Sequence, residues 1–370
     1  MPRFAERLPS FPLSNSEPPM TKTIQGNFFE DFMPGQVLRH AVPRTVTEGD
    51  VALYTALYGA RFPLPASAPA AEELGYRGAP LDDGLTFHLV FGKTVPDISL
   101  NAVANLGYAE GVFRRPVYPG DTLSTESEVI GVKQNSNGKT GTVYVRATGT
   151  NQRGETVLSY VRWVMVRKRD PESPAPEPVV PELRAAVPAA ALIAPPHVDF
   201  AGYDPALSGQ PYLFEDYAVG ERIDHVDGQT IEEAEHQMAT RLYHNTARVH
   251  FNQHVEQDGR FGQRIVYGGH IISMARALSF NGLGNACALA AINGGQHTNP
   301  SFAGDTIYAW SEVIDRADLP GRNDVGALRL RTVAVKNRPC GDFPGRDEAG
   351  KPSPDMVLDL DYTVWMPRRG

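Results

Sequence analysis

The chain has 370 residues, of which 41% are hydrophobic and 21% charged, and its formal net charge is −8. This composition predicts a globular protein of two or three domains, and the acidic balance without a dense Lys/Arg run argues against nucleic acid or an anionic membrane as the main partner. The sequence has no apolar run near the roughly 18 residues of a membrane-spanning helix, and its two cysteines, Cys287 and Cys340, favour a cytoplasmic location without disulfides.

The segment 1–23 shows no periodic pattern of apolar residues. Proline and serine interrupt each apolar pair, and no hydrophobic core of a secretory signal is present. We therefore expect residues 1–23 to form a flexible N-terminal tail.

The remainder of the chain repeats itself once. The sequence FEDF at 29–32 recurs as FEDY at 214–217, and PGDT at 119–122 recurs as AGDT at 303–306. At nearly the same spacing, further matches join Thr45 with Thr230, Glu48 with Glu233, Leu57-Tyr58 with Leu242-Tyr243, and Gly84 with Gly269. Ordered matches of this kind predict two homologous halves, 24–169 and 212–370. Between them, residues 170–211 hold ten prolines, which predicts an extended linker rather than a core element.

Each half has the same order of expected elements. Thr47 and Thr230 are candidate N-caps of a short helix, and a glycine-led helix follows at 84–95 or 269–280. Alternating apolar residues then predict antiparallel strands, with turns at Asn137-Gly138 and Arg153-Gly154. One long helix against a curled antiparallel sheet is an α+β unit, and we expect the two sheets to join edge to edge.

The stretch 241–278 carries the candidate chemistry. It contains Asn245 and His250, and farther along it Gly268 and Gly269 stand at the start of an apolar helical pattern. An imidazole can act as a base near neutral pH, while the N–H groups at a helix start can hold a developing oxyanion. This combination suits chemistry on a carbonyl compound.

These residues resemble the MaoC-like, R-specific enoyl-CoA hydratase family. The family pattern is roughly Gly-Asp-x-Asn-Pro-Ile-His, followed at a set distance by a glycine that opens a helix, and the second half reads HNTARVH at 244–250 before Gly269. His250 and Gly269 match the pattern, but the catalytic Asp of the family falls on Asn245. In the first half the two catalytic positions are Ala60 and Pro65, so that half is expected to be degenerate.

The resemblance spans nearly the whole chain and implies a double hot-dog fold. FFEDF at 28–32, NTARVHFNQ at 245–253 and IVYGGHIIS at 265–273 most resemble the mesaconyl-CoA hydratases (β-methylmalyl-CoA dehydratases) of that family. The implied activity is reversible addition of water to the C=C of a short branched enoyl-CoA. No cofactor is implied, because CoA belongs to the substrate, and a homodimer is expected.

The resemblance assigns His250 as the base that activates water, Asn245 as a ligand of that water, and the Gly269 N–H as a donor to the thioester oxygen, beside Gly268. An amide cannot take up a proton, so either His250 performs both transfers or a distant carboxylate helps. The candidates for such a carboxylate are Asp82, Asp83 and Glu256. Asn245 could equally be a turn residue.

Several arginines are candidate substrate ligands. Arg248 could hold the distal carboxylate of a dicarboxylic acyl group through its two-pronged guanidinium, or it could face solvent. Arg264 and Arg114-Arg115 could meet the CoA phosphates, although surface ion pairs explain them better. We expect no metal, because His250 and His254 lack both an HExxH context and a third ligand.

Two other functions fit the same sequence. A hot-dog acyl-CoA thioesterase would need a carboxylate near a helix start, which Asp82-Asp83 could supply, and would not need His250. A non-catalytic acyl-CoA-binding protein would need neither the carboxylate nor His250, because it catalyses no reaction.

Overall fold

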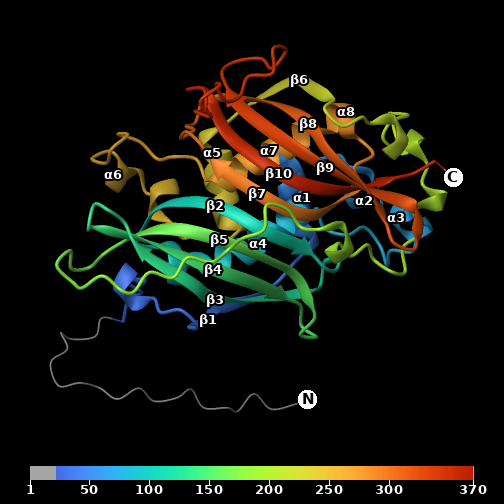
Figure 1. Ribbon diagram of the computed structural model, residues 1–370. Helices are drawn as coiled ribbons and strands as arrows, with labels where there is room; N and C mark the ends of the chain where they lie inside the picture. The colour runs from blue at the N-terminus through green and yellow to red at the C-terminus, as the bar shows by residue number, and fades with distance from the viewer. Residues whose placement is uncertain (1–21, 370) are drawn as a thin grey trace.

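A computed structural model describes residues 22–369 of the chain (Figure 1). Its strands form one ten-stranded sheet in the order β1-β3-β4-β5-β2-β7-β10-β9-β8-β6, and all the pairings are antiparallel. The strands of the first half are β1 (Val37–Thr45), β2 (Ala102–Phe113), β3 (Thr122–Gln134), β4 (Thr140–Thr150) and β5 (Thr156–Arg167). Those of the second half are β6 (Arg222–Thr230), β7 (Ala288–His297), β8 (Thr306–Leu319), β9 (Arg322–Lys336) and β10 (Met356–Pro367).

The two five-stranded sheets join through β2 and β7. Tyr108 pairs with Gly295 and Ala109 pairs with Gly294. The expected edge-to-edge join is therefore confirmed, and it removes one exposed edge from each half.

The helices of the described residues are α1 (Glu48–Tyr58), α2 (Pro63–Ala66), α3 (Ala68–Glu73), α4 (Asp83–Thr94), α5 (Glu233–Leu242), α6 (Gln253–Glu256), α7 (Gly268–Leu278) and α8 (Phe280–Leu283). Of these, α4 and α7 pack against several strands of the sheet. The central helices α4 and α7 are buried along almost their whole length, and they lie within one residue of the predicted starts. A long helix enclosed by an antiparallel sheet in each half makes this an α+β double hot-dog fold. None of the helices in residues 22–369 combines the length and hydropathy needed to cross a bilayer.

Matched side chains make matched contacts in the two halves. His40 Nε2 lies 2.8 Å from Ser127 Oγ, and its counterpart His225 Nε2 lies 2.8 Å from Ser311 Oγ. The hairpin turns at Gly138 and Gly154 both have positive φ, as the predicted Asn-Gly and Arg-Gly turns require.

The helix caps differ between the halves. Thr47 caps α1 as predicted, because its side chain accepts a hydrogen bond from the Asp50 N–H. The prediction for Thr230 is wrong: Thr230 lies at the end of β6 and pairs with Thr306, and α5 follows Glu232 without a side-chain cap.

The segment 170–211 is only partly the extended linker that its prolines predict. Val179 bridges to Val132 along the first half. Val198 and Phe200, in contrast, are buried in a cluster with Trp365, so this part of the segment is a core element. Apolar side chains between the prolines, such as Val198 and Phe200, explain why this part of the segment packs into the core. The expected tail, 1–23, lies almost wholly outside the described residues.

Candidate active site

His250 lies at the end of a short 3₁₀ turn, η7 (Arg248–His250), in the loop between α5 and α7. Its Nδ1 is 3.0 Å from the carbonyl oxygen of Ile265. Because a carbonyl can only accept, Nδ1 carries the proton and Nε2 keeps its lone pair. Burial lowers the pKa of His250 to about 4, against the opposing effect of the Ile265 hydrogen bond. The ring is therefore neutral at pH 7 and presents Nε2 as a base.

The start of helix α7 offers unfilled hydrogen-bond donors. Its N-cap, Tyr267, makes no capping hydrogen bond through its side chain, and within residues 22–369 the N–H groups of Gly268 and Gly269 meet no acceptor. The equivalent position in the first half is filled, because Asp82 Oδ1 accepts the Gly84 N–H at 2.8 Å. Helix α7 thus presents free N–H groups with partial positive charge, whereas α4 presents a carboxylate.

Both glycines are required by close packing. A Cβ on Gly269 would lie 2.3 Å from Tyr267 Cε1 and 2.6 Å from His88 Cε1. A Cβ on Gly268 would lie 2.5 Å from both Cε1 and Nε2 of His297. The sequence indicated that glycine opens this helix, and the structure shows that aromatic and imidazole rings lie directly against it.

His297, at the end of β7, is a functional candidate that the sequence did not reveal. Its ring lies against Gly268, and its Nε2 is 3.3 Å from the Tyr108 hydroxyl of the first half. Burial, together with the smaller effect of a charge on His250, lowers the pKa of His297 to about 4. A histidine at the end of a strand carries no local motif, so only the tertiary packing places it beside α7.

The Tyr267 ring links His250 to the other half. Its centroid lies 5.6 Å from that of His250 and 5.7 Å from that of His88. His88, in α4, also places Nε2 2.9 Å from Ser273 Oγ in α7. The first half therefore supplies part of the wall around the candidate site, although its own catalytic positions hold Ala60 and Pro65.

Asn245 is buried near the base of the same loop. Its Oδ1 accepts a hydrogen bond from the Ala247 N–H at 3.0 Å, which is the turn role that the sequence left open. Its Nδ2 has no partner among the described residues and remains able to donate.

The two predicted arginine ligands have different environments. Arg248 is exposed, and its guanidinium makes no ion pair within residues 22–369. Arg264 is buried, and it pairs with Glu233 Oε1 at 2.6 Å, as the ion-pair interpretation expects.

Two of the three candidate carboxylates, Asp82 and Asp83, lie outside the His250 loop, and the third, Glu256, lies within it. Asp82 and Asp83 are at the start of α4, where they accept the N–H groups of Gly84 and Leu289. Glu256 is on the short helix α6. None of the three makes a hydrogen bond to His250.

Two cavities lie beyond the His250 loop. One lies between α4 and α7, and Ser273 and Arg276 are among the residues that line its largely apolar walls. The other opens at the start of α4. His250 lines neither of these two cavities.

Known proteins share both the sequence and the fold. Beta-methylmalyl-CoA dehydratase from Chloroflexus aurantiacus is 67% identical over 94% of this chain and 99% of its own length. Mesaconyl-CoA hydratase from Cereibacter sphaeroides is 58% identical over 94% of this chain and 100% of its own.

Solved structures agree with these relatives. One from C. aurantiacus, described as a MaoC domain protein dehydratase, superposes with a TM-score of 0.93 at 67% identity, over 95% of this chain and 100% of that one. A conserved protein from Mycobacterium tuberculosis with a double hot-dog fold gives a TM-score of 0.75 at 26% identity, over 92% and 98%. The family model for mesaconyl-CoA hydratase matches residues 19–349. The chain therefore belongs to the mesaconyl-CoA hydratase family.

Proposed function

We propose that the chain is an enoyl-CoA hydratase that adds water reversibly to the C=C of mesaconyl-CoA, giving β-methylmalyl-CoA. Family membership supports the reaction class, and the names of the two most similar relatives described above support the substrate. The observation that carries the proposal is the state of His250: a neutral imidazole, fixed by Ile265, with a free Nε2 in the loop that precedes the uncapped start of α7.

The proposed mechanism uses these groups in sequence. His250 Nε2 removes a proton from water as the water oxygen bonds to the β-carbon of the enoyl thioester. The electron pair of the C=C moves towards the thioester oxygen, where the N–H groups of Gly268 and Gly269 stabilise the enolate. The α-carbon then takes up a proton from the His250 imidazolium, and the base is restored. A positioned base of this kind contributes roughly 10²–10⁴ in rate.

Four residues have supporting roles in this proposal. Asn245 Nδ2 would donate to the attacking water while Oδ1 holds the turn. Arg248, exposed and without an ion pair, would bind the distal carboxylate of the acyl group, and buried Arg264 would support the loop rather than reach the CoA phosphates. His297, against Gly268, would orient the thioester at the helix start.

We further propose that the enzyme needs neither a cofactor nor a metal, because His250 supplies the proton transfers and the main-chain N–H groups stabilise the enolate. We also propose that the enzyme is a homodimer in the cytoplasm. The free, buried thiols of Cys287 and Cys340 fit a reducing compartment.

The assay for this proposal follows the thioester and the thiol together. With purified enzyme and mesaconyl-CoA, we expect the absorbance of the conjugated thioester to fall while no free CoA thiol appears. Release of thiol in step with the absorbance change would instead indicate a thioesterase. Unchanged absorbance with bound CoA ester would indicate a binding protein.

The structure favours hydration over the thioesterase. That alternative depends on Asp82 and Asp83, but Asp82 is occupied in capping Gly84 and contacts the Tyr54 hydroxyl at 3.3 Å. Asp83 accepts the Leu289 N–H at 2.7 Å, and burial raises its pKa to about 7, which makes it a weak nucleophile.

A further inference from the structure

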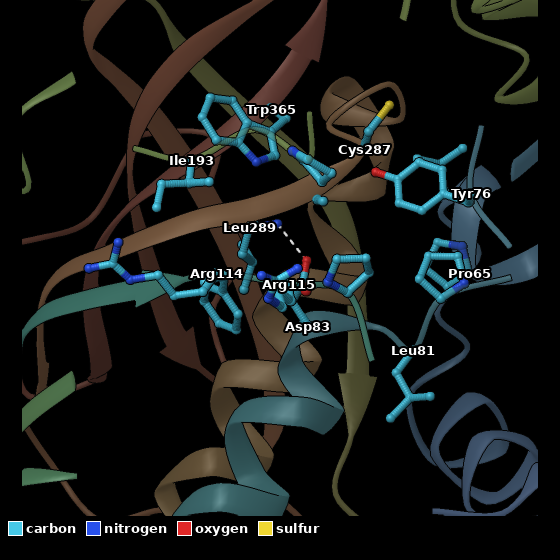
Figure 2. A pocket seen from close by; sticks show the side chains of 16 residues that line it. Pro65, Tyr76, Leu81, Asp83, Arg114, Arg115, Ile193, Cys287, Leu289 and Trp365 are labelled. Atoms are coloured by element: carbon cyan, nitrogen blue, oxygen red, sulfur yellow. Dashed lines mark hydrogen bonds between the residues drawn. The ribbon is translucent and has the colours of Figure 1, made fainter. Parts of the chain in front are cut away.

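The cavity at the start of α4 is the counterpart, in the first half, of the candidate active site (Figure 2). The repeat in the sequence relates Pro65 to His250, Asp83 to Gly268, and Phe113 to His297. Pro65, Asp83 and Phe113 all line the cavity. The repeat has therefore preserved a hollow at the place where the second half carries its chemistry.

This hollow lacks both catalytic features of its counterpart. Proline replaces the imidazole at position 65, and the N–H of Gly84 is already taken by Asp82. A ligand could be held here, but it would not be turned over.

The residues that line the cavity favour a ligand with an apolar group and one atom that can form a hydrogen bond. The buried part of the lining comes mainly from Leu64, Tyr76, Leu81, Phe113 and Trp365. At the floor, Asp83 Oδ2 accepts the Leu289 N–H at 2.7 Å, while Oδ1 has no partner among the described residues. Burial, together with the charge of Asp82, raises the pKa of Asp83 to about 7, so a large fraction of its carboxyl is protonated at neutral pH and can donate to a carbonyl oxygen.

The rim carries positive charge. Arg114 and Arg115 are both exposed and line the cavity. Arg114 makes no side-chain ion pair or hydrogen bond within residues 22–369, and Arg115 has only a 3.7 Å contact with Glu155. Two exposed guanidinium groups of this kind can bind the phosphates of an anionic ligand.

We propose that this cavity is a second, non-catalytic binding site for a CoA thioester, with the acyl carbonyl at Asp83, the apolar chain against Trp365 and Phe113, and the phosphates at Arg114 and Arg115. The ligand class is taken from the proposed function, on which this inference rests. Occupancy of the site would let the enzyme bind two thioesters per chain while converting one.

Calorimetric titration of the full-length chain with methylsuccinyl-CoA tests this site, because that thioester has no C=C to hydrate. We expect two molecules bound per chain. In the variant Arg114→Ala/Arg115→Ala the affinity of the second site should be weakened by about tenfold or more, while the first site keeps its affinity. Both arginines are exposed, so this variant should fold, and its unfolding temperature checks that it does.

The control variant Arg39→Ala/Arg167→Ala removes two other exposed guanidinium groups of the first half, which do not line the cavity. It should retain two sites. One site in the wild-type chain would overturn the second site and leave the proposed function standing, whereas no binding at all would count against the proposed function itself. Two sites with wild-type affinities in the Arg114→Ala/Arg115→Ala variant would show that the second ligand binds elsewhere.

Discussion

The hydroxyl groups of Tyr58 and Tyr243, which occupy the same position in the two halves of the repeat, lie 2.8 Å apart. Both side chains are fully buried. Tyr58 Oη also lies 2.9 Å from Nδ1 of His270, a histidine of α7 whose pKa is lowered by burial to about 3. His270 is therefore neutral, and the chain of hydrogen bonds runs from Tyr243 through Tyr58 to His270 at the centre of the molecule.

Because the Tyr58 hydroxyl has two hydrogen-bond partners and the Tyr243 hydroxyl has one, we expect the two groups to contribute unequally to the free energy of unfolding. Tyr243→Phe removes one donor from Tyr58 and should lower the free energy of unfolding by about 1–2 kcal/mol. Tyr58→Phe leaves the Tyr243 hydroxyl and His270 Nδ1 both buried without a partner, so we expect a loss of about 2–4 kcal/mol. Urea unfolding of the two single variants measures the difference.

The double variant Tyr58→Phe/Tyr243→Phe provides the control. It should cost little more than Tyr58→Phe alone, because the unpaired Tyr243 hydroxyl is then absent. Strictly additive losses would contradict the chain of hydrogen bonds.

Acid should destabilise the fold through its buried histidines. His88, His225 and His270 are less than 2% exposed, and burial lowers their pKa values to about 3, 4 and 3. Below about pH 6.5 the unfolded chain binds protons at these sites and the folded chain does not, so stability falls as the pH falls. Each histidine contributes up to about 1.4 kcal/mol per pH unit until its folded pKa is reached.

The carboxyl of Asp83 has the opposite effect on stability as the pH falls. Because its pKa is raised to about 7, the folded chain binds a proton there at a higher pH than the unfolded chain does. One such group does not offset three histidines. Urea unfolding at pH 7.5, 6 and 5 should therefore show a steadily smaller free energy of unfolding. A constant value over this range would show that the histidines are already charged in the folded protein.

Gly268 should matter more for turnover than for folding. In Gly268→Ala the new methyl would lie 2.5 Å from the His297 ring, which must move away from the helix start. We expect kcat/KM for mesaconyl-CoA to fall by about tenfold or more, and the unfolding midpoint to change less than in a core variant.

Gly294→Ala is the matched control, since it lies in the same strand as His297 and its Cβ would meet no atom closer than 4.0 Å. Its kcat/KM should stay near the wild-type value. Equal losses of kcat/KM in the two variants would contradict the role proposed for the Gly268–His297 contact.

Arg248 tests how the acyl group is recognised. Arg248→Ala should raise KM for mesaconyl-CoA, which has a distal carboxylate, more than for crotonyl-CoA, which has none. Steady-state kinetics with both substrates measures this. The same change in KM for both substrates would indicate that Arg248 faces solvent and does not bind the distal carboxylate.

The sequence predicted the features that depend on local pattern or on the repeat. The regular spacing between matching segments indicated two similar units, and the Gly-containing hairpins follow from positive φ angles that few other residues tolerate. The glycines at the starts of α4 and α7 were predicted from their place before an apolar helical pattern. Thr230 misled the prediction because a threonine fits a strand end as well as a helix cap. In the structure, pairing with Thr306 decides between the two.

The remaining features arise only from packing between distant segments. His297 meets Gly268 because β7 runs past the start of α7, and Asp82 fills the helix start in the first half where Tyr267 leaves it open in the second. Phe200 enters the core from within a proline-rich segment. No spacing along the chain indicates these contacts.

The most direct measurement is the turnover of mesaconyl-CoA by His250→Gln, with circular dichroism to confirm that the variant is folded. Glutamine can still donate to the Ile265 carbonyl but cannot accept a proton from water, so kcat/KM should fall by at least about a hundredfold. A folded His250→Gln variant that hydrates mesaconyl-CoA at close to the wild-type rate would contradict the assignment of His250 as the base.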